Sequence, residues 1–229
     1  MNAPTNLPLI PFSLNGEKIE ALEGETIIQA AQRNGVEIPH MCYSKDLRPD
    51  GNCRACMVEI KGERVLSPSC CRTPKPDMEV TSNSARAITS QKLVLELLLS
   101  DMPVKDYKPD NELTYWAQKM GVSRPRFEPR ISPAADLSNP AIAVNLDACI
   151  QCTRCIRACR EVQVNDVIGY AFRGSHAEIV FDLGDPMGDS TCVTCGECVQ
   201  ACPTGALSPG NGAYLIKPAS PPAVLAALA

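Results

Sequence analysis

Two cysteine-rich segments with the same spacing constrain the fold of this chain more than any other feature. Residues 149–159 read CIQCTRCIRAC, and residues 192–203 read CVTCGECVQACP. Both follow the pattern CxxCxxCxxxC, and the second continues directly into Pro203. Four thiols in so short a segment, repeated once, require the surrounding chain to fold around whatever these thiols bind.

This is the spacing of bacterial-type [4Fe–4S] sites, where three cysteines of a segment bind one cubane and the fourth binds the other cubane. Zinc is the alternative, but zinc sites pair two CxxC units across a longer spacer and need no third cysteine so close by. We therefore predict two clusters that exchange their fourth ligands. The first would be held by Cys149, Cys152, Cys155 and Cys202, and the second by Cys192, Cys195, Cys198 and Cys159.

A third cysteine group lies earlier, in the segment CYSKDLRPDGNCRAC at residues 42–56. Four thiolates on a long loop suit a [2Fe–2S] centre, although the spacing differs from the plant-type pattern. Gly51 would let the backbone pass close to the centre. Zinc is a stronger alternative here than at the repeats. The predicted ligands are Cys42, Cys53, Cys56 and Cys70, with Cys71 as the alternative to Cys70 because only one of two neighbouring thiolates can serve.

Cysteine makes up 13 of the 229 residues, and its use indicates a reducing compartment. The N-terminal sequence MNAPTNLPLIPF lacks the basic and apolar regions of a signal peptide, and no segment approaches about 18 uninterrupted apolar residues. We therefore expect a cytoplasmic protein, in which clustered CxxC spacings indicate metal or redox chemistry rather than disulfides. The net charge of −4 argues against a general nucleic-acid surface. It leaves protein partners open.

Catalytic motifs are missing from the sequence. Neither GxGxxG nor a Walker loop occurs, and the chain has only two histidines. We expect His40 to be a hydrogen-bonding loop residue and His176 a solvated turn residue. No catalytic residue is therefore predicted, and no cofactor-binding residue beyond the cluster ligands.

The sequence outside the cysteine segments predicts short elements. Asn15-Gly16 lies between two β-type runs and is typical of a type I′ hairpin turn. The next segment predicts a helix over 26–33 that Gly35 ends in a left-handed conformation. Two strands are expected at 57–60 and 64–66. Two helices are expected at 85–100 and 111–120, and the second should have Trp116 in the core and end at Gly121. A linker at 122–140 and a hairpin over 167–183, turning near Gly174-Ser175, should follow.

Together these elements predict an α+β fold in three parts and a tail. Residues 1–83 would form a β-grasp [2Fe–2S] ferredoxin-like domain, and residues 84–140 a small helical middle domain with its linker. Residues 141–216 would form a bacterial-type ferredoxin-like domain with two [4Fe–4S] clusters, and 217–229 a proline- and alanine-rich tail. With 4% aromatic residues and 20 prolines, the chain is expected to rely on cofactors to organise its fold.

The order of these parts resembles the N-terminal electron-transfer region of NADH:quinone oxidoreductase large subunits and of NAD-reducing hydrogenase diaphorase subunits. It is most similar to that of NAD-dependent formate dehydrogenase alpha subunits. The similarity extends from about residue 8 to 216. The segments that carry it are CRACMVEIKGERVL with its following SC, NLDACIQCTRCIRACREVQVNDVIGYAFRG, IVFDLGDPMG and CVTCGECVQACPTGAL.

Two departures from the formate dehydrogenase pattern matter. Many family members carry a further [4Fe–4S] site with one histidine and three cysteines in the middle region. This chain has Met102 at the histidine position and no cysteine between Cys71 and Cys149, so that cluster is expected to be missing. The alpha subunits also continue into a pterin catalytic domain, whereas this sequence stops at Ala229, so no complete active site is expected on it.

The resemblance implies an electron-transfer subunit of a hetero-oligomeric cytoplasmic oxidoreductase, and leaves open whether the chain itself is an enzyme. It would pass electrons between a formate-oxidising molybdenum- or tungsten-pterin subunit and a flavin subunit that reacts with NAD. The alternatives are a diaphorase-type subunit of an NAD-reducing hydrogenase or complex-I-like assembly, a truncated catalytic alpha subunit, and a metal-stabilised scaffold without redox function. The expected cofactors are one [2Fe–2S] and two [4Fe–4S] clusters.

Overall fold

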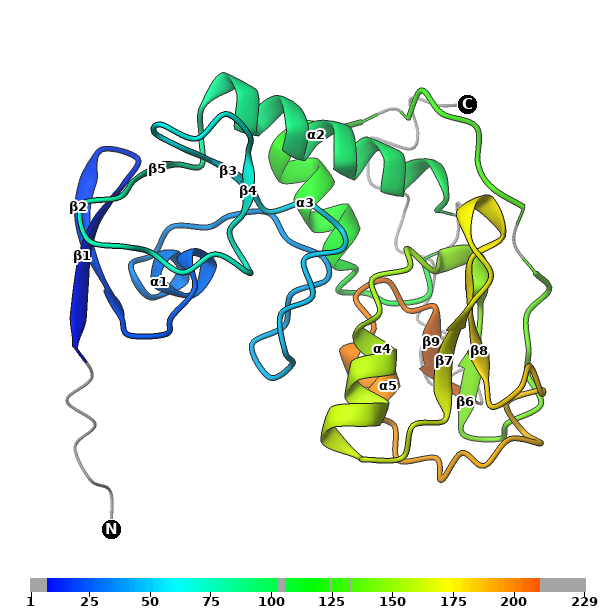
Figure 1. Ribbon diagram of the computed structural model, residues 1–229. Helices are drawn as coiled ribbons and strands as arrows, with labels where there is room; N and C mark the ends of the chain where they lie inside the picture. The colour runs from blue at the N-terminus through cyan, green and yellow to red at the C-terminus, as the bar shows by residue number, and fades with distance from the viewer. Residues whose placement is uncertain (1–7, 103–105, 124, 132, 211–229) are drawn as a thin grey trace, which may run out of the picture. The chain divides into compact units, whose positions relative to one another are not determined.

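A computed structural model describes residues 8–102, 106–123, 125–131 and 133–210 (Figure 1). The chain forms two compact units. The first comprises Met1–Lys45 and Pro49–Val94, and the second comprises Asp46–Arg48 and Leu95–Ala229. The division falls inside helix α2 (Ala85–Ser100). The predicted tail lies outside the described residues.

A five-stranded mixed sheet forms the first unit, in the order β2-β1-β5-β3-β4. Strands β1 and β5 run parallel, and the other neighbours pair antiparallel. Alternate residues of β1 point into the core, where Phe12 and Leu14 are buried. The strand bounds are β1 Leu9–Leu14, β2 Glu17–Leu22, β3 Met57–Ile60, β4 Ser67–Pro68 and β5 Glu79–Thr81.

The predicted hairpin is confirmed at the turn between β1 and β2. Asn15 and Gly16 have φ values of 55° and 88°, the left-handed conformation at both central residues that a type I′ turn requires. Leu14 pairs with Glu17 across the turn. The Asn15 side chain also accepts a hydrogen bond of 2.8 Å from the Ser82 main chain just after β5. The turn is therefore held at the end of the sheet.

Helix α1 (Ile27–Arg33) packs against this sheet, and its predicted start and end are confirmed. The Gln29 side chain accepts a 2.9 Å hydrogen bond from the Thr26 main-chain nitrogen, as in a capping box. Gly35 adopts φ 74° after the last turn. Four helix residues belong to the sheet's hydrophobic core, namely Ile27, Ile28, Ala30 and Ala31. Burial of this face fixes the helix on the sheet.

The second strand predicted for this region is displaced along the chain. Residues 64–66 were expected to pair with β3 through a turn at Lys61-Gly62, but β4 is Ser67–Pro68. The end of β3 pairs with β5 instead, with Ile60 opposite Val80. The antiparallel partner β4 therefore begins later in the sequence than predicted. Val65 is consequently 58% exposed. Strand β5 was not predicted, because three residues give too short a pattern to recognise.

Helices α2 and α3 (Glu112–Met120) confirm the helical predictions. The Asn111 side chain caps α3 by accepting hydrogen bonds from the main-chain nitrogens of Leu113 and Thr114. Gly121 ends the helix with φ 66°. Trp116 is 5% exposed, which confirms its core role.

The described part of the predicted linker contains no helix, but it is anchored. Arg126 forms a bidentate ion pair with Glu96 of α2, at 2.6 and 2.8 Å. Asp136 forms an isolated bridge with Val144. These contacts hold the segment against the second unit along its length.

The second unit combines two short antiparallel sheets with short helices (Figure 1). The predicted hairpin is confirmed as β7 and β8, joined through a 3₁₀ turn at Gly174–His176. Helices α4 and α5 follow the two cysteine loops and contact each other, and α4 continues into a π-helical turn, η2, that contains Cys159. The bounds are β6 Ile142–Val144, β7 Ile168–Ala171, β8 Glu178–Phe181, β9 Leu207–Pro209, α4 Arg154–Arg157, η2 Ala158–Val162 and α5 Glu197–Ala201.

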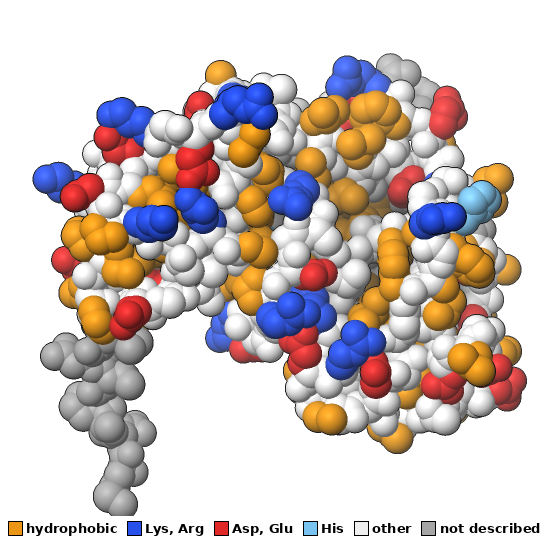
Figure 2. Space-filling view, in the orientation of Figure 1, with side chains coloured by type: hydrophobic (Ala, Val, Ile, Leu, Met, Phe, Trp, Pro, Cys, Tyr) orange, Lys and Arg blue, Asp and Glu red, His pale blue; other side chains and the backbone are white. Residues whose placement is uncertain are grey.

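Surface charge, helix hydrophobicity and disulfides can each indicate the class of a protein. On the face shown in Figure 2, Lys and Arg side chains are intermixed with Asp and Glu. Within the described residues, no helix has the length and apolarity needed to cross a membrane. No disulfide joins any of the thirteen cysteines, all of which lie in the described part of the chain.

Gly205 of the second unit combines a positive φ with a close approach of another segment, so it should tolerate substitution poorly. It has φ +81°, and an added Cβ would lie 2.8 Å from the Lys108 Cβ and 2.9 Å from the Tyr107 carbonyl carbon. We expect Gly205→Ala to destabilise the unit by about 2–4 kcal/mol, through backbone strain plus overpacking. The measurement is thermal unfolding of the anaerobically purified protein.

Gly184→Ala is the matched control, because Gly184 also has a positive φ but nothing lies within 4 Å of the added Cβ. It should cost about 1 kcal/mol. Equal melting temperatures for the two variants would contradict the close approach at Gly205.

Candidate iron–sulfur sites

The loop before β3 and the turn after β4 bring four cysteines of the first unit together. The Cys42 main-chain nitrogen donates a 3.3 Å hydrogen bond to the Cys53 Sγ. The Cys70 thiol contacts those of Cys42 and Cys56. Cys42, Cys56 and Cys70 are buried, and Cys53 is half-buried. The predicted set thus shares one small volume, although its members span 29 residues.

Contacts among these thiols shift their pKa values. The Cys42 and Cys56 thiols, together with burial, raise the pKa of Cys70. The Cys70 thiol in turn lowers the pKa of Cys56 to about 7, and the Cys42 thiol raises the pKa of Cys53. Adjacent thiolates repel, so all four can be deprotonated together only when a cation offsets their charge. This donor set therefore fits an iron–sulfur centre.

Cys71 lies differently from its neighbour. It is exposed, and its Sγ is 3.6 Å from the Cys70 Sγ. A Cβ on Gly51 would lie 2.8 Å from the Cys71 Sγ, and Gly51 has φ +67°. Gly51 was expected to let the backbone pass close to a [2Fe–2S] centre. The group that lies close to it is the Cys71 side chain.

In the second unit, one cavity is lined by four cysteines from both repeats. Cys149, Cys152 and Cys155 come from the first repeat, and Cys202 comes from the second. Apolar side chains that include Ile179 and Leu207 also line this small cavity. All four cysteines are buried, and burial raises the pKa of Cys152 to about 12. A buried, sulfur-lined space of this kind fits a cluster that brings its own positive charge.

The remaining four cysteines also gather. Burial raises the pKa of Cys198 to about 12, and the nearby charges of Cys192, Cys195 and Cys159 add to the shift. Cys159 reaches this group from the π-helical turn, away from the other cysteines of its own repeat. Cys195 is exposed and Cys192 is half-buried, so this group is closer to solvent than the first.

A [4Fe–4S] cluster and a single metal ion place different demands on their ligands. Among the described residues, no three His, Cys, Asp or Glu side chains are arranged to hold one metal ion. Ligands of a [4Fe–4S] cluster bind separate iron atoms and need not converge on one point.

The cations around the first group were not predicted from the sequence. Arg154 and Arg157 are 5% and 4% exposed, and Arg154 forms a bidentate ion pair with Glu112. Arg130 donates a 2.5 Å hydrogen bond to the Cys149 carbonyl. Arg154 and Arg157 lie inside the cysteine repeat, at positions that the cysteine spacing leaves unspecified. Fully buried arginines are rare, but burial cannot be read from the sequence.

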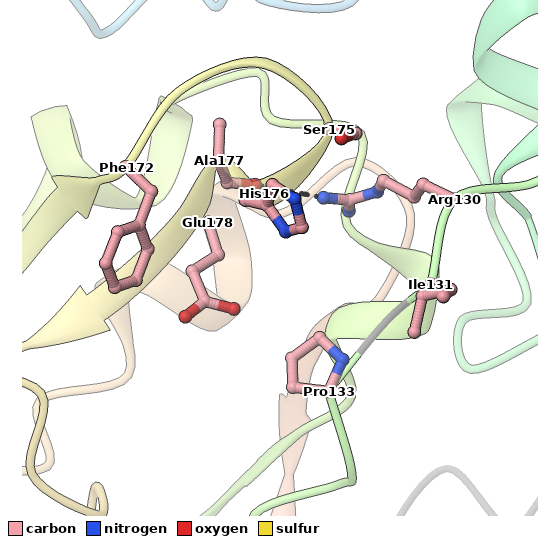
Figure 3. Close-up of a pocket in the computed structure, with 8 residues that line it drawn as sticks. All are labelled: Arg130, Ile131, Pro133, Phe172, Ser175, His176, Ala177 and Glu178. Carbon is pink, nitrogen blue, oxygen red and sulfur yellow. Dashed lines mark hydrogen bonds between the residues drawn. The ribbon is translucent and has the colours of Figure 1, made fainter.

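The two histidines behave as predicted. The His40 ring lies 2.8 Å from the Ile38 carbonyl oxygen, and His176 is an exposed turn residue. His176 lines a shallow pocket with Arg130, Phe172 and Glu178 (Figure 3). In this view the Arg130 guanidinium points toward the hairpin turn, where it donates a 3.1 Å hydrogen bond to the Ala177 carbonyl.

Comparison with known families agrees with this geometry. Residues 8–85 match the family described as 2Fe-2S iron-sulfur cluster binding domain. Residues 139–208 match the family described as NADH-quinone oxidoreductase subunit 3, ferredoxin-like domain. The chain carries two ferredoxin-type domains. We refer to them below as the [2Fe–2S] domain and the ferredoxin-like domain.

Relatives that match most of this chain bear the names of several oxidoreductases. A subunit of the NADH-quinone oxidoreductase of Rhizobium meliloti is 33% identical over 92% of this chain, and the HndD subunit of the NADP-reducing hydrogenase of Solidesulfovibrio fructosivorans is 32% identical over 88%. A Staphylococcus haemolyticus protein whose name assigns it provisionally to the formate dehydrogenases is 27% identical over 89%. The chain covers 25%, 36% and 21% of these relatives, respectively.

The fold has a solved counterpart. A chain in the crystal structure of an NAD+-reducing [NiFe]-hydrogenase in the H2-reduced state superposes with a TM-score of 0.82 and is 25% identical. The match covers 90% of this chain and 89% of that chain. The fold of this chain is therefore similar, over most of its length, to that of a chain of this hydrogenase.

The different burial of Cys70 and Cys71 gives a direct test of this site. In the native, cluster-loaded protein we expect a maleimide reagent to modify Cys71 and to leave Cys70 intact, because only Cys71 is accessible. Fragment mass spectrometry of the peptide that contains both residues identifies the modified position. Cys71→Ser should abolish labelling of this peptide, and modification of Cys70 in the wild-type protein would contradict the structure.

Proposed function

We propose that this chain is the iron–sulfur electron-transfer subunit of a multi-subunit oxidoreductase. The observation that carries the proposal is the gathering of twelve cysteines into three groups of four, two of which each contain one cysteine of the other repeat. In the [2Fe–2S] domain the proposed ligands are Cys42, Cys53, Cys56 and Cys70. In the ferredoxin-like domain, Cys149, Cys152, Cys155 and Cys202 hold one cluster, and Cys192, Cys195, Cys198 and Cys159 hold the other.

When bound, such clusters take up and release single electrons at potentials set by their surroundings. The chain's own residues supply position and environment. Cys159 and Cys202 each leave their own repeat, so neither ligand loop can move without displacing a ligand of the other site. Burial of the Cys149 group by Ile150, Ile179 and Leu207 keeps water away from its thiolates. The separation of the two sites is thereby fixed, as stepwise electron transfer requires.

We propose a formate-oxidising molybdenum- or tungsten-pterin subunit as one partner and a flavin subunit that reacts with NAD as the other. The motif resemblance stated above and the Staphylococcus haemolyticus relative support this choice. A diaphorase-type role in an NAD-reducing hydrogenase or complex-I-like assembly is the second candidate. It is favoured by the higher identity to the subunits of those enzymes and by the hydrogenase superposition.

The two candidates differ in the substrate that reduces the clusters. A tagged chain isolated anaerobically from its own organism should bring its partners with it. Formate, and not hydrogen, should then bleach the cluster absorbance and reduce NAD. Bleaching by hydrogen alone would favour the hydrogenase form of the second candidate. Bleaching by NADH, and by neither formate nor hydrogen, would favour its complex-I-like form.

Metal analysis tests the cluster content. We expect about ten iron atoms and about ten labile sulfides per chain from one [2Fe–2S] and two [4Fe–4S] clusters. About fourteen iron atoms would contradict the expected lack of the His-and-three-Cys cluster. Zinc in place of iron, in a colourless protein, would refute the electron-transfer role.

Serine variants test the last [2Fe–2S] ligand. Cys70→Ser should abolish or strongly alter the [2Fe–2S] electron paramagnetic resonance signal, because the Cys70 thiol lies against those of Cys42 and Cys56. Cys71→Ser is the matched control and should leave the signal unchanged. An unchanged signal in Cys70→Ser would show that another residue is the ligand.

A further inference from the structure

Three cationic side chains hold the main chain of the first cysteine group in the ferredoxin-like domain. The Cys149 carbonyl accepts a hydrogen bond from Arg130 at 2.5 Å, and the Cys152 carbonyl accepts one from Arg157 at 3.2 Å. The Cys202 carbonyl accepts one from the Lys108 Nζ at 3.1 Å. Three of the four residues proposed as ligands of one cluster thus each have their own cation. We call Lys108, Arg130 and Arg157 the cation set.

The cation set is drawn from separate segments. Lys108 precedes α3, Arg130 lies between α3 and β6, and Arg157 ends α4. Arg157 is 4% exposed as a residue, and the side chains of Arg130 and Lys108 are 10% and 15% exposed. Burying a cation is costly unless a negative charge or a set of acceptors compensates it. The carbonyls of this cysteine group supply such acceptors, and the three cations thereby place positive charge beside its thiols.

The acidic partners of these cations lie nearer to solvent. The Asp101 side chain that pairs with Arg130 is 27% exposed, and the Asp110 side chain that pairs with Lys108 is 76% exposed. The Arg154–Glu112 pair is oriented in the same way, with side chains 6% and 33% exposed. Exposed charges are screened more strongly than buried ones. The positive charge of the cations is therefore screened less than the negative charge of these partners.

The second cysteine group has different neighbours. Burial and the Cys192, Cys195 and Cys159 thiols raise the pKa of Cys198. The Cys159 carbonyl accepts from the main chain of Asn165, and the Cys198 carbonyl from that of Cys202. The two groups thus differ in electrostatic surroundings although their sequence spacing is the same.

We propose that the cation set raises the reduction potential of the cluster held by Cys149, Cys152, Cys155 and Cys202. This inference rests on the ligand assignment under the proposed function. One-electron reduction breaks no bond in the cluster and adds one negative charge to it. Nearby cations stabilise that added charge, whereas burial of the site disfavours it. The cation set therefore offsets the effect of burial, and this cluster can accept electrons despite its dry surroundings.

The test is a redox titration with dithionite, followed by electron paramagnetic resonance, on the full cluster-loaded chain. We compare Arg130→Gln and Lys108→Met with wild type. Each variant should lower the ratio of reduced to oxidised cluster about tenfold at a fixed potential, which corresponds to about 59 mV for a one-electron couple. Only one of the two [4Fe–4S] signals should shift. Arg130→Lys, which keeps the charge, should shift it much less.

Arg126→Gln is the matched control. Arg126 lies four residues before Arg130 in the same segment, but its side chain is 72% exposed and its charge faces Glu96. We expect no change in either [4Fe–4S] potential. Cys149→Ser identifies the first cluster, because the signal that it removes or alters must be the one that Arg130→Gln shifts.

Each outcome can be assigned. A wild-type protein without two [4Fe–4S] signals would refute the proposed function itself. Normal iron and sulfide content with unshifted potentials in Arg130→Gln and Lys108→Met would refute the cation set's role. Equal shifts in both clusters, or in Arg126→Gln as well, would also refute it. Loss of the cluster in both charge-removing variants would show that the cations act only in assembly.

Discussion

Thiols far apart in the sequence must meet in a small buried volume, and the ferredoxin-like domain is arranged around this constraint. Cys202 joins Cys149, Cys152 and Cys155, whereas Cys159 joins the three cysteines of the other repeat. This exchange requires α4 and α5 to contact each other and β9 to return beside β6. Without a cation at each group, the thiols repel one another as they lose protons, and burial adds to the cost. Fold and cofactor therefore depend on each other.

The same constraint explains why buried arginines gather in so small a domain. Their guanidinium groups donate to carbonyls of the cysteine loop, so they hold its main chain and contribute positive charge at the same time. The first group combines strong burial with this charge, whereas the second group lies nearer to solvent. Two cysteine groups with identical spacing thus have different surroundings.

Much of the local structure was predictable, because it depends on a few neighbouring residues. The type I′ turn at Asn15-Gly16, the Gly35 and Gly121 helix ends, the core position of Trp116 and the β7–β8 hairpin were predicted from local patterns and are confirmed. The strand expected at 64–66 was wrong because its position depends on β5, a three-residue strand with no pattern of its own. Anchoring of the segment before β6 was also missed, because it depends on ion pairs with α2.

The sequence by itself determined which cysteines form the groups, since ligand spacing is dictated by the geometry of the centres that the loops enclose. It could not separate Cys70 from Cys71, because neighbouring residues have nearly the same sequence surroundings. The tertiary structure buries one thiol against Cys42 and Cys56 and turns the other toward Gly51 and solvent. Only the tertiary structure also placed Lys108, Arg130 and Arg157 at one group, because side chains from distant segments meet there through packing that no local pattern encodes.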